Sequence, residues 1–425
     1  MLRITGMMRA RLAALFMLCA LPAGATPPAE SADSTPARPK AVLLAPKVVV
    51  YDAGIRRNYT SDVDKESTRA NLTTSLMDVA RTSANFDIVP APTLTADEQD
   101  AVDEVSAVLE ALVPLKGQPD PSGLAGDRHA PVDWHVGRPL AFLRERTGAD
   151  FALVTIAYQV GQTPEAAVLG TGIAVAGTLL VAPMLPPITP SFVAACLVDL
   201  RTGELAWFKV ARGVTISGIA AWDLRDPVSA AEVIAKTWRA YPEPPDYKVD
   251  HPPAASTGTP TLESETTPRS GGFGARPPSR WNVLHGRHDL TFTLNGPLLN
   301  QIEISLREHY RALPTTGVST SRRMAAAELA ELYVAELRAA SLEHLEIREV
   351  STTATLAEKP AFRIRFSYRQ PLRVNDLPVE QVTVGTAVDD GLLLAQYVAP
   401  SLNFFEQTLP TFEKSAASIT RRPRR

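Results

Sequence analysis

A long stretch without apolar periodicity divides this chain of 425 residues. Residues 242–280 contain Pro-Pro pairs and a Gly-Gly pair within a run rich in Thr, Ser and Glu. Such a segment cannot bury enough apolar surface to offset the entropy lost on ordering. We therefore predict a disordered linker between two folded units, residues 41–241 and 281–420. A flexible chain of about forty residues spans roughly 35 Å, which would let the units bind separately.

Residues 1–25 have the parts of a secretory signal peptide. Arginines precede an uncharged apolar run at residues 12–21, and Ala23-Gly24-Ala25 provides the small residues of a cleavage site. The apolar run is shorter than the roughly twenty residues that span a bilayer. We expect export to the periplasm with cleavage after Ala25, with outer-membrane association as an open alternative. Residues 26–40 would then form a flexible leader.

The chain has two cysteines, Cys19 and Cys196. Cys19 lies within the predicted signal peptide. A lipoprotein signal needs a small residue before its cysteine, and Leu18 is bulky, so plain cleavage is favoured over lipidation. Cys196 lies in an apolar strand, where a thiol behaves as a small hydrophobic group with little thiolate.

The overall charge gives no general attraction to nucleic acid. The net charge is -3 and the isoelectric point is near 6.2, whereas phosphate binding needs a concentrated basic surface. The exception is the basic tail, residues 421–425. We expect a disordered solubilising end there, with contact to anionic lipid or polymer as the alternative.

The first unit alternates apolar runs with helical patterns. Thr95 and Glu98 form a capping box before a helical stripe, Gly148 is placed to end a short helix, and Gly203 lies where a turn needs positive φ. This order predicts an α/β unit with a sheet covered by helices. The expected strands are 42–51, 86–89, 151–158, 192–200 and 204–214, and the expected helices are 65–82, 95–112, 139–146 and 227–241.

One segment of this unit, residues 166–198, has no charged residue. Its centre is slightly too short for a membrane-spanning helix, and its glycines and the prolines that follow disfavour a stable helix. A buried hairpin is the simpler interpretation. The alternative is contact of residues 166–185 with a membrane or another subunit through Leu169, Ile173, Val175, Leu179 and Leu180.

The second unit has the pattern of an α+β domain. Asn295-Gly296 after a strand at 289–294 indicates a hairpin, and Phe404 begins a terminal helix that ends near residue 419. The sequence therefore predicts a mixed or antiparallel sheet covered by helices. The other expected elements are a helix at 324–340 and strands at 345–350, 362–368, 379–384 and 392–399.

Arginines alternate with apolar residues in the strand at 362–368. Side chains alternate along a strand, so Arg363 and Arg365 share one face, with Arg369 and Arg373 just beyond. Guanidinium groups in a row can bind carboxylates or phosphates of a partner. The alternative is a solvated face balanced by glutamates of neighbouring elements.

Catalytic motifs are absent from the sequence. It contains no G-x-S-x-G elbow, no H-E-x-x-H pair and no glycine-rich phosphate loop. His285 and His288 adjoin Asp289, and the loop of His129, Asp133 and His135 groups similar side chains, but neither spacing defines a metal site. We therefore expect no enzyme activity, no cofactor and no metal.

Two resemblances add to this interpretation. The first is carried by Gly148–Leu153, the hairpin Leu197–Phe208 and Asp223-Leu224-Arg225, which resemble exported bacterial proteins similar to the periplasmic fold of CsgG and the amino-terminal domain of TolB. It implies a sheet flanked by helices and an envelope role. Tyr397–Pro400, Asn403–Phe405 and Leu409–Glu413 resemble PsbP-like exported domains, which implies an adaptor or assembly module.

The function expected from these observations is a non-enzymatic adaptor or assembly factor of the cell envelope. It would act by binding a protein or envelope partner, with contact to a membrane surface as a further option. One alternative is an oligomeric secretion or pore component of the outer membrane that uses residues 166–185. The other is a metal-dependent hydrolase. The sequence identifies neither the partner nor the oligomeric state.

Overall fold

The computed structural model shows an α+β protein with two seven-stranded sheets. Residues Arg38–Arg425 form one compact unit. The predicted signal peptide, residues 242–260 and the apolar segment up to residue 189 lie outside the part of the chain that the structure describes. The described residues are 38–53, 58–60, 62–83, 86–113, 135–162, 190–214, 222–238, 261–294 and 298–424.

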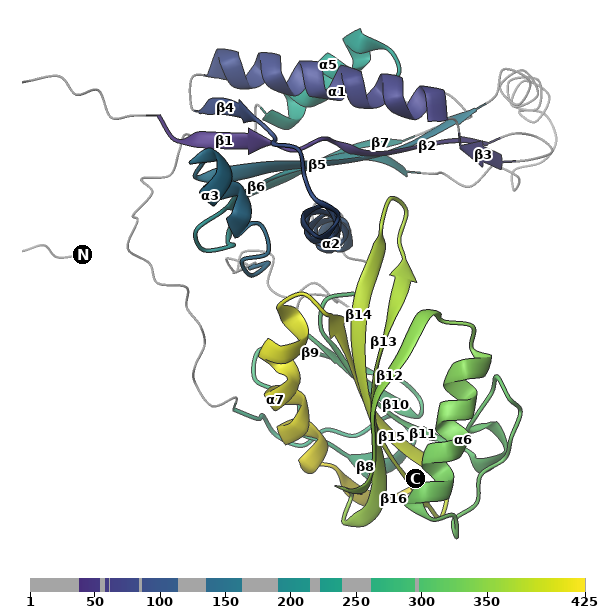
Figure 1. Cartoon of the computed structure of the whole chain (residues 1–425). Helices are drawn as coiled ribbons and strands as arrows, with labels where there is room; N and C mark the ends of the chain where they lie inside the picture. Colours follow the sequence, from purple (N-terminus) through teal and green to yellow (C-terminus); the bar gives the residue numbers. More distant parts are fainter. Residues whose placement is uncertain are drawn as a thin grey trace, which may run out of the picture. The chain divides into compact units, whose positions relative to one another are not determined.

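The first sheet is mixed and is built around β5 (Figure 1). Along one edge β5 pairs in parallel with both β1 and β2, and along the other edge it pairs antiparallel with β6. The strands are β1 (Lys40–Leu43), β2 (Lys47–Ala53), β3 (Asn58–Thr60), β4 (Asp87–Pro90), β5 (Phe151–Gln162), β6 (Pro190–Asp199) and β7 (Leu205–Val214).

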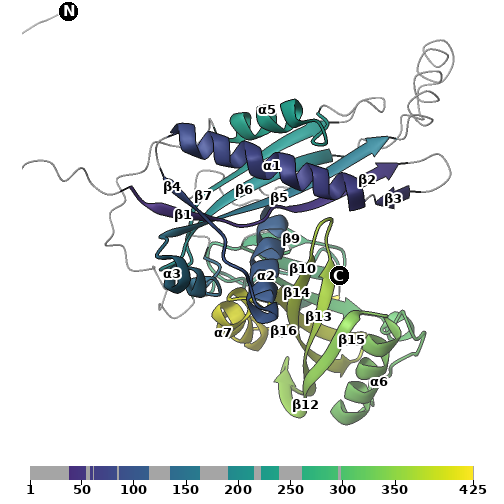
Figure 2. The ribbon, with the colours of Figure 1, turned by 45° about the horizontal axis from the view of Figure 1, so that its top comes forward.

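Helices cover both faces of this sheet, as the α/β prediction requires. In both views α1 (Asp62–Ser83) and α5 (Pro227–Trp238) lie on one face, and α2 (Ala96–Leu112) and α3 (Ala141–Thr147) on the other (Figures 1 and 2). Because β5 is buried on both sides, the first part of its sequence, residues 151–157, is nearly continuously apolar rather than alternating.

Two predicted helix ends are confirmed in detail. The Thr95 hydroxyl accepts a hydrogen bond from the Glu98 amide at 3.3 Å, and the Glu98 carboxylate accepts one from the Thr95 amide at 2.8 Å. Gly148 ends α3 in the left-handed conformation with φ 65°. These local signals set where α2 begins and α3 ends.

The second sheet is antiparallel, in the order β12-β13-β14-β15-β11-β10-β9. Helix α6 (Ala326–Ala339) lies on one face and α7 (Phe404–Ala417) on the other (Figure 1). A short 3-10 turn, η2, spans His309–Arg311. The strands are β9 (Asn282–His285), β10 (Asp289–Thr293), β11 (Gln301–Arg307), β12 (Glu343–Leu356), β13 (Lys359–Pro371), β14 (Asp376–Val388) and β15 (Gly391–Pro400).

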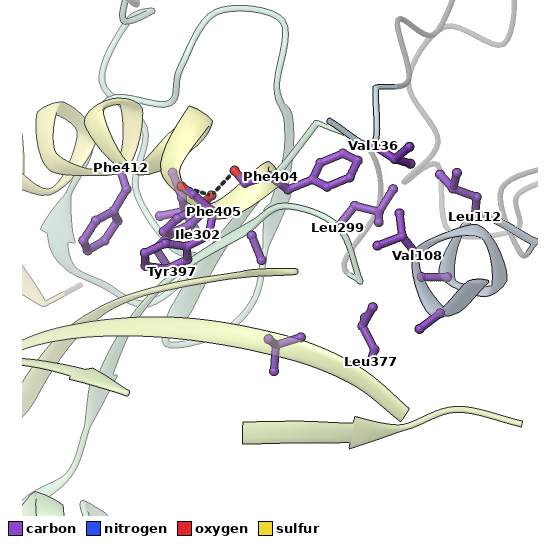
Figure 3. Packing of buried hydrophobic residues seen from close by; sticks show 14 of the residues in the cluster. Val108, Leu112, Val136, Leu299, Ile302, Leu377, Tyr397, Phe404, Phe405 and Phe412 are labelled. Carbon is purple, nitrogen blue, oxygen red and sulfur yellow. Dashed lines mark hydrogen bonds between the residues drawn. The ribbon is translucent and has the colours of Figure 1, made fainter. Parts of the chain in front are cut away.

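Tyr397 forms the centre of the core under α7. Its ring stacks on Phe405 and Phe412 with ring centroids 5.2 and 5.6 Å away. Its hydroxyl lies 3.1 and 3.2 Å from the carbonyl oxygens of Phe404 and Phe405 (Figure 3). A buried hydroxyl needs such partners, so these bonds join the first turn of α7 to β15.

The structure corrects two predicted segments. Part of the expected linker, residues 261–280, carries β8 (Gly271–Gly274), which pairs with β16 (Thr420–Arg424) in the expected basic tail. The Glu265 carboxylate accepts hydrogen bonds from the Arg422 guanidinium at 2.6 and 2.9 Å. Backbone pairing and this charge balance order two segments whose composition alone predicts disorder. The second unit therefore begins near residue 261.

Substitution of Gly203 would test how closely the β6–β7 turn packs against Gly137. Its φ of 82° confirms the predicted positive φ, and a Cβ there would lie 1.6 Å from the carbonyl oxygen of Gly137. Gly148 is the matched control, because its φ is 65° but a Cβ would have nothing within 4 Å. We expect Gly148→Ala to lower the free energy of unfolding by about 1–2 kcal/mol. Gly203→Ala should lower it by clearly more in urea denaturation, and equal losses would contradict this packing.

Candidate functional site

The arginines of β13 lie on the face of the second sheet that carries α7. Phe362, Ile364 and Phe366 are buried on the α6 side, so the predicted alternation is confirmed. The Arg365 guanidinium lies over the Phe405 ring, 4.8 Å from its centroid, which places it beside α7.

Arg365 is held by two carboxylates. Its Nε and one terminal nitrogen donate to the Glu380 carboxylate at 2.9 and 2.5 Å, and it also bonds to Glu406. Burial works to lower the pKa of Arg365, but these hydrogen bonds outweigh it and raise the pKa. Glu380 is itself buried and accepts a further bond from Arg348 at 2.5 Å. This part of the row is an internal charge network.

The other arginines predicted as a row differ in their surroundings. Arg363 forms ion pairs with Glu349 at 2.5 Å and Glu413 at 3.6 Å. Arg369 and Arg373 are exposed, near the end of β13 and in the turn that follows it. The glutamate-balanced alternative therefore describes Arg363 and Arg365. The positive charge of Arg369 acts on Glu104 of α2, where it opposes the rise in pKa that burial causes.

The turn between β13 and β14 is bound by a buried carboxylate of α2, Glu110. This carboxylate accepts hydrogen bonds from the backbone amides of Arg373, Val374 and Asn375 at 2.7, 2.9 and 2.9 Å. The Asn375 side-chain amide donates a fourth bond at 2.9 Å. We call this arrangement the Glu110 clamp. Burial raises the pKa of Glu110, although the four hydrogen bonds oppose the shift.

Sequence reasoning missed Glu110, although it left a signal. It lies in the apolar half of α2, beside Leu109, and is only 5% exposed. A charged residue on a buried helical face needs a specific partner. The pattern could therefore have marked Glu110, but not its partner more than 260 residues away.

Apolar side chains continue the contact beside the clamp. Val108 and Leu112 of α2 share one buried cluster with Leu299, Leu377 and Phe404 of the second sheet and its helix (Figure 3). Each fully buried side chain of this size contributes about 1.5–3 kcal/mol to stability. The sequence predicted separately binding units, but within Arg38–Arg425 the two sheets share this core.

A second polar contact lies at the edge of the cluster. The Asn403 side-chain amide donates to the His135 carbonyl oxygen at 2.9 Å. The Gly137 amide donates to His135 Nδ1 at 3.2 Å. His129 and Asp133, the other members of the predicted histidine loop, lie outside the described residues.

The remaining candidates for chemistry do not come together. His285 Nδ1 contacts the Thr267 carbonyl oxygen at 3.0 Å, and His288 Nδ1 contacts the Ser270 hydroxyl at 2.9 Å. Among the residues that the structure describes, no three His, Cys, Asp or Glu side chains are placed to hold a metal ion.

Residues proposed for membrane contact cannot be placed. The candidates Leu169, Ile173, Val175, Leu179 and Leu180 all lie outside the described residues. Within the described part of the chain, every helix is too short or too polar to cross a membrane.

Comparison with known proteins finds no matching family model and no matching curated protein. Solved structures do match. A protein from Bacteroides thetaiotaomicron matches at 10% identity and a TM-score of 0.25, over 38% of this chain and half of its own length. PsbP from Synechocystis matches at 11% identity and a TM-score of 0.25, over 39% of this chain and 95% of its own.

A third similar structure is LpqN from Mycobacterium tuberculosis, which is involved in cell envelope biogenesis. It matches at 15% identity and a TM-score of 0.24, over 38% of this chain and 92% of its own. PsbP is thus among the similar structures, whereas we find no match to CsgG or TolB. At these scores the similarities carry no argument about function.

The clamp predicts a large cost for removing the Glu110 side chain. Glu110→Ala leaves three part-buried backbone amides without their acceptor, and a lost hydrogen bond to a charged group costs about 1.5–3 kcal/mol. We expect the free energy of unfolding to fall by about 3 kcal/mol or more in urea denaturation. Glu104→Ala is the matched control, because Glu104 lies half-buried on the same helix with a pKa raised by burial. Similar losses in both variants would contradict the clamp.

The reactivity of Cys196 would test whether the interior of the first sheet is closed to solvent. The thiol is fully buried, and burial raises its pKa well above the ordinary value. In a chain beginning at Thr26, the thiol should stay unreactive toward a disulfide reagent at neutral pH. It should react fully once urea unfolds the protein. Rapid reaction of the native protein would show that β6 is not covered as described.

Proposed function

We propose that this protein is a non-enzymatic adaptor or assembly factor of the cell envelope that acts by binding a protein or envelope partner. The Glu110 clamp and the apolar cluster beside it carry this proposal. They join two differently built sheets through a shared core, so a partner meets a preformed surface. Binding to a preformed surface loses less conformational entropy than binding to separate units.

The surface most suited to a partner lies around Arg369 and Arg373. The clamp fixes the backbone of Arg373, and its guanidinium lies over the Tyr158 ring, 5.2 Å from the centroid. Burial and the nearby Arg373 lower the pKa of Arg212, so positive charge is concentrated here. A carboxylate or phosphate of the partner would be the complementary group.

The location proposed for this activity is the periplasm. It rests on the predicted signal peptide, residues 1–25, and association with the outer membrane is part of the same proposal. The pore alternative depends on residues 166–185, and the hydrolase alternative depends on His129, Asp133 and His135. Residues 166–185, His129 and Asp133 lie outside the described residues, and His135 Nδ1 accepts a bond from the Gly137 amide, so no observation of the structure favours either alternative.

Site-specific crosslinking in native cell envelopes would test the binding surface. A photoreactive residue at Pro371, which is exposed and lies between the two arginines, should capture one dominant partner. The double variant Arg369→Glu with Arg373→Glu should abolish that product, because reversed charge repels an anionic partner. The matched control reverses Arg322 and Arg323, which are also adjacent exposed arginines, and should leave the product unchanged.

Three results would contradict the proposal. The crosslink could survive charge reversal at Arg369 and Arg373, although the purified variant keeps the wild-type free energy of unfolding. The protein could resist extraction from membranes by carbonate, which indicates insertion. The purified protein could also turn over an envelope compound, which would make it an enzyme.

A further inference from the structure

The face of the second sheet that carries α6 becomes polar beyond that helix. Under α6 this face is apolar, with Phe362 and Ile364 of β13 packed against Leu329. Farther across the sheet, paired positions bring four polar side chains onto one line. They are Thr291 of β10, Glu303 of β11, Gln396 of β15 and Thr383 of β14. Directly paired residues point to the same side, so these four form what we call the polar row.

Hydrogen bonds hold one end of the polar row in place. The Gln396 side-chain nitrogen donates to the Tyr333 hydroxyl at 2.8 Å, and the Gln396 oxygen accepts a bond from Arg307 at 3.3 Å. The Thr383 hydroxyl lies 3.3 Å from that of Tyr333. Tyr333 belongs to α6, so the helix edge orients Gln396 and draws the Arg307 guanidinium toward the row.

Glu303 lies in the middle of the row without a partner of its own. It is half-buried and forms no hydrogen bond or ion pair with any described residue. Burial raises its pKa, Arg307 opposes the shift, and Asp289 adds to it. A carboxylate and a guanidinium thus share one face without pairing directly. Partly buried charge is costly unless it is compensated, so this arrangement suits a ligand group that bridges the two.

Two buried hydroxyls beside the row also lack partners. Thr293 is 0% exposed and Ser305 is 6% exposed, and neither side-chain oxygen has a hydrogen bond within the described residues. Each lies two positions from a member of the row, Thr291 or Glu303, and therefore on the same face. Most buried polar side-chain atoms are hydrogen-bonded, so these two hydroxyls leave hydrogen-bonding capacity unused directly beside the polar row.

We infer that the polar row binds a neutral ligand with several hydroxyl groups, a saccharide. A hydroxyl both donates and accepts, so one sugar hydroxyl can donate to Glu303 while another accepts from Arg307. A phosphate would be repelled by Glu303, and an amine would be repelled by Arg307. Asp289, paired with Ser305 on the same face, adds a second carboxylate and disfavours an anion further, whereas a neutral polyol can bond to groups of either charge. This site uses none of the residues of the proposed partner surface and stands independently of it.

The saccharide could be a free sugar or part of an envelope glycan. Calorimetric titration of the chain beginning at Thr26 would distinguish them, with glucose, galactose, N-acetylglucosamine and soluble peptidoglycan glycan strands as probes. Binding of a monosaccharide indicates a free sugar. Binding of the glycan strands alone indicates the polymer. Either result supports the inferred ligand class.

Two substitutions would test whether the polar row is the site at which the saccharide binds. Glu303→Gln and Arg307→Gln should each weaken binding by about tenfold or more, because each removes a hydrogen bond to a charged group. Glu331→Gln, on the exposed side of α6, is the matched control and should bind as the wild type does. Glu303→Gln removes a partly buried charge, so it should keep the wild-type free energy of unfolding.

The inference is overturned if no saccharide probe binds at concentrations up to about 10 mM. It is also overturned if binding is unchanged in both Glu303→Gln and Arg307→Gln. A third overturning result would be that inorganic phosphate or glycine binds at this site in place of the sugars.

Discussion

The buried carboxylate of Glu110 is the interaction on which the arrangement of the two sheets depends. It lies two residues before the end of α2, where the helix dipole is unfavourable for negative charge, and the last turn of α2 has no basic residue. The three consecutive amides of residues 373–375 supply the compensating positive ends of peptide dipoles. The apolar cluster beside it buries further apolar surface. The clamp fixes the position of the β13–β14 turn against α2, because only one placement of the turn gives the carboxylate all its hydrogen bonds.

The same turn explains why the β13 arginines divide into two kinds. Within the sheet, Arg365 faces the buried Glu380, and each charge makes the burial of the other tolerable. Toward the turn the backbone itself pairs with Glu110, so the Arg373 side chain is not used to neutralise that carboxylate. Its guanidinium lies over the Tyr158 ring instead. A row that is uniform in the sequence therefore divides into arginines paired with glutamates within the second sheet and an arginine in the turn, whose side chain packs on the first sheet.

Local sequence signals predicted most helices and strands correctly, but they did not predict which distant segments pack or pair with one another. The Thr95 capping box, Gly148, Gly203 and the alternation in β13 depend on neighbouring residues, and all were predicted correctly. By contrast, β8 and β16 pair across about 150 residues, and each sequence alone is rich in glycine, proline or arginine. The strand β11 was missed although its Ile302, Ile304 and Leu306 alternate with polar residues as a strand should.

Two carboxylates, Glu303 of β11 and Glu110 of α2, are withdrawn from solvent in different surroundings. Ile302 and Ile304 face the core under α7, so β11 would be equally well anchored with any neutral residue at position 303. Glu110 is satisfied by four hydrogen bonds within the protein, and its role is therefore structural. Glu303 has no such bond among the described residues and lies beside two unpaired buried hydroxyls. Since the fold gains nothing from a partly buried charge there, Glu303 is the carboxylate that the inferred saccharide would pair with.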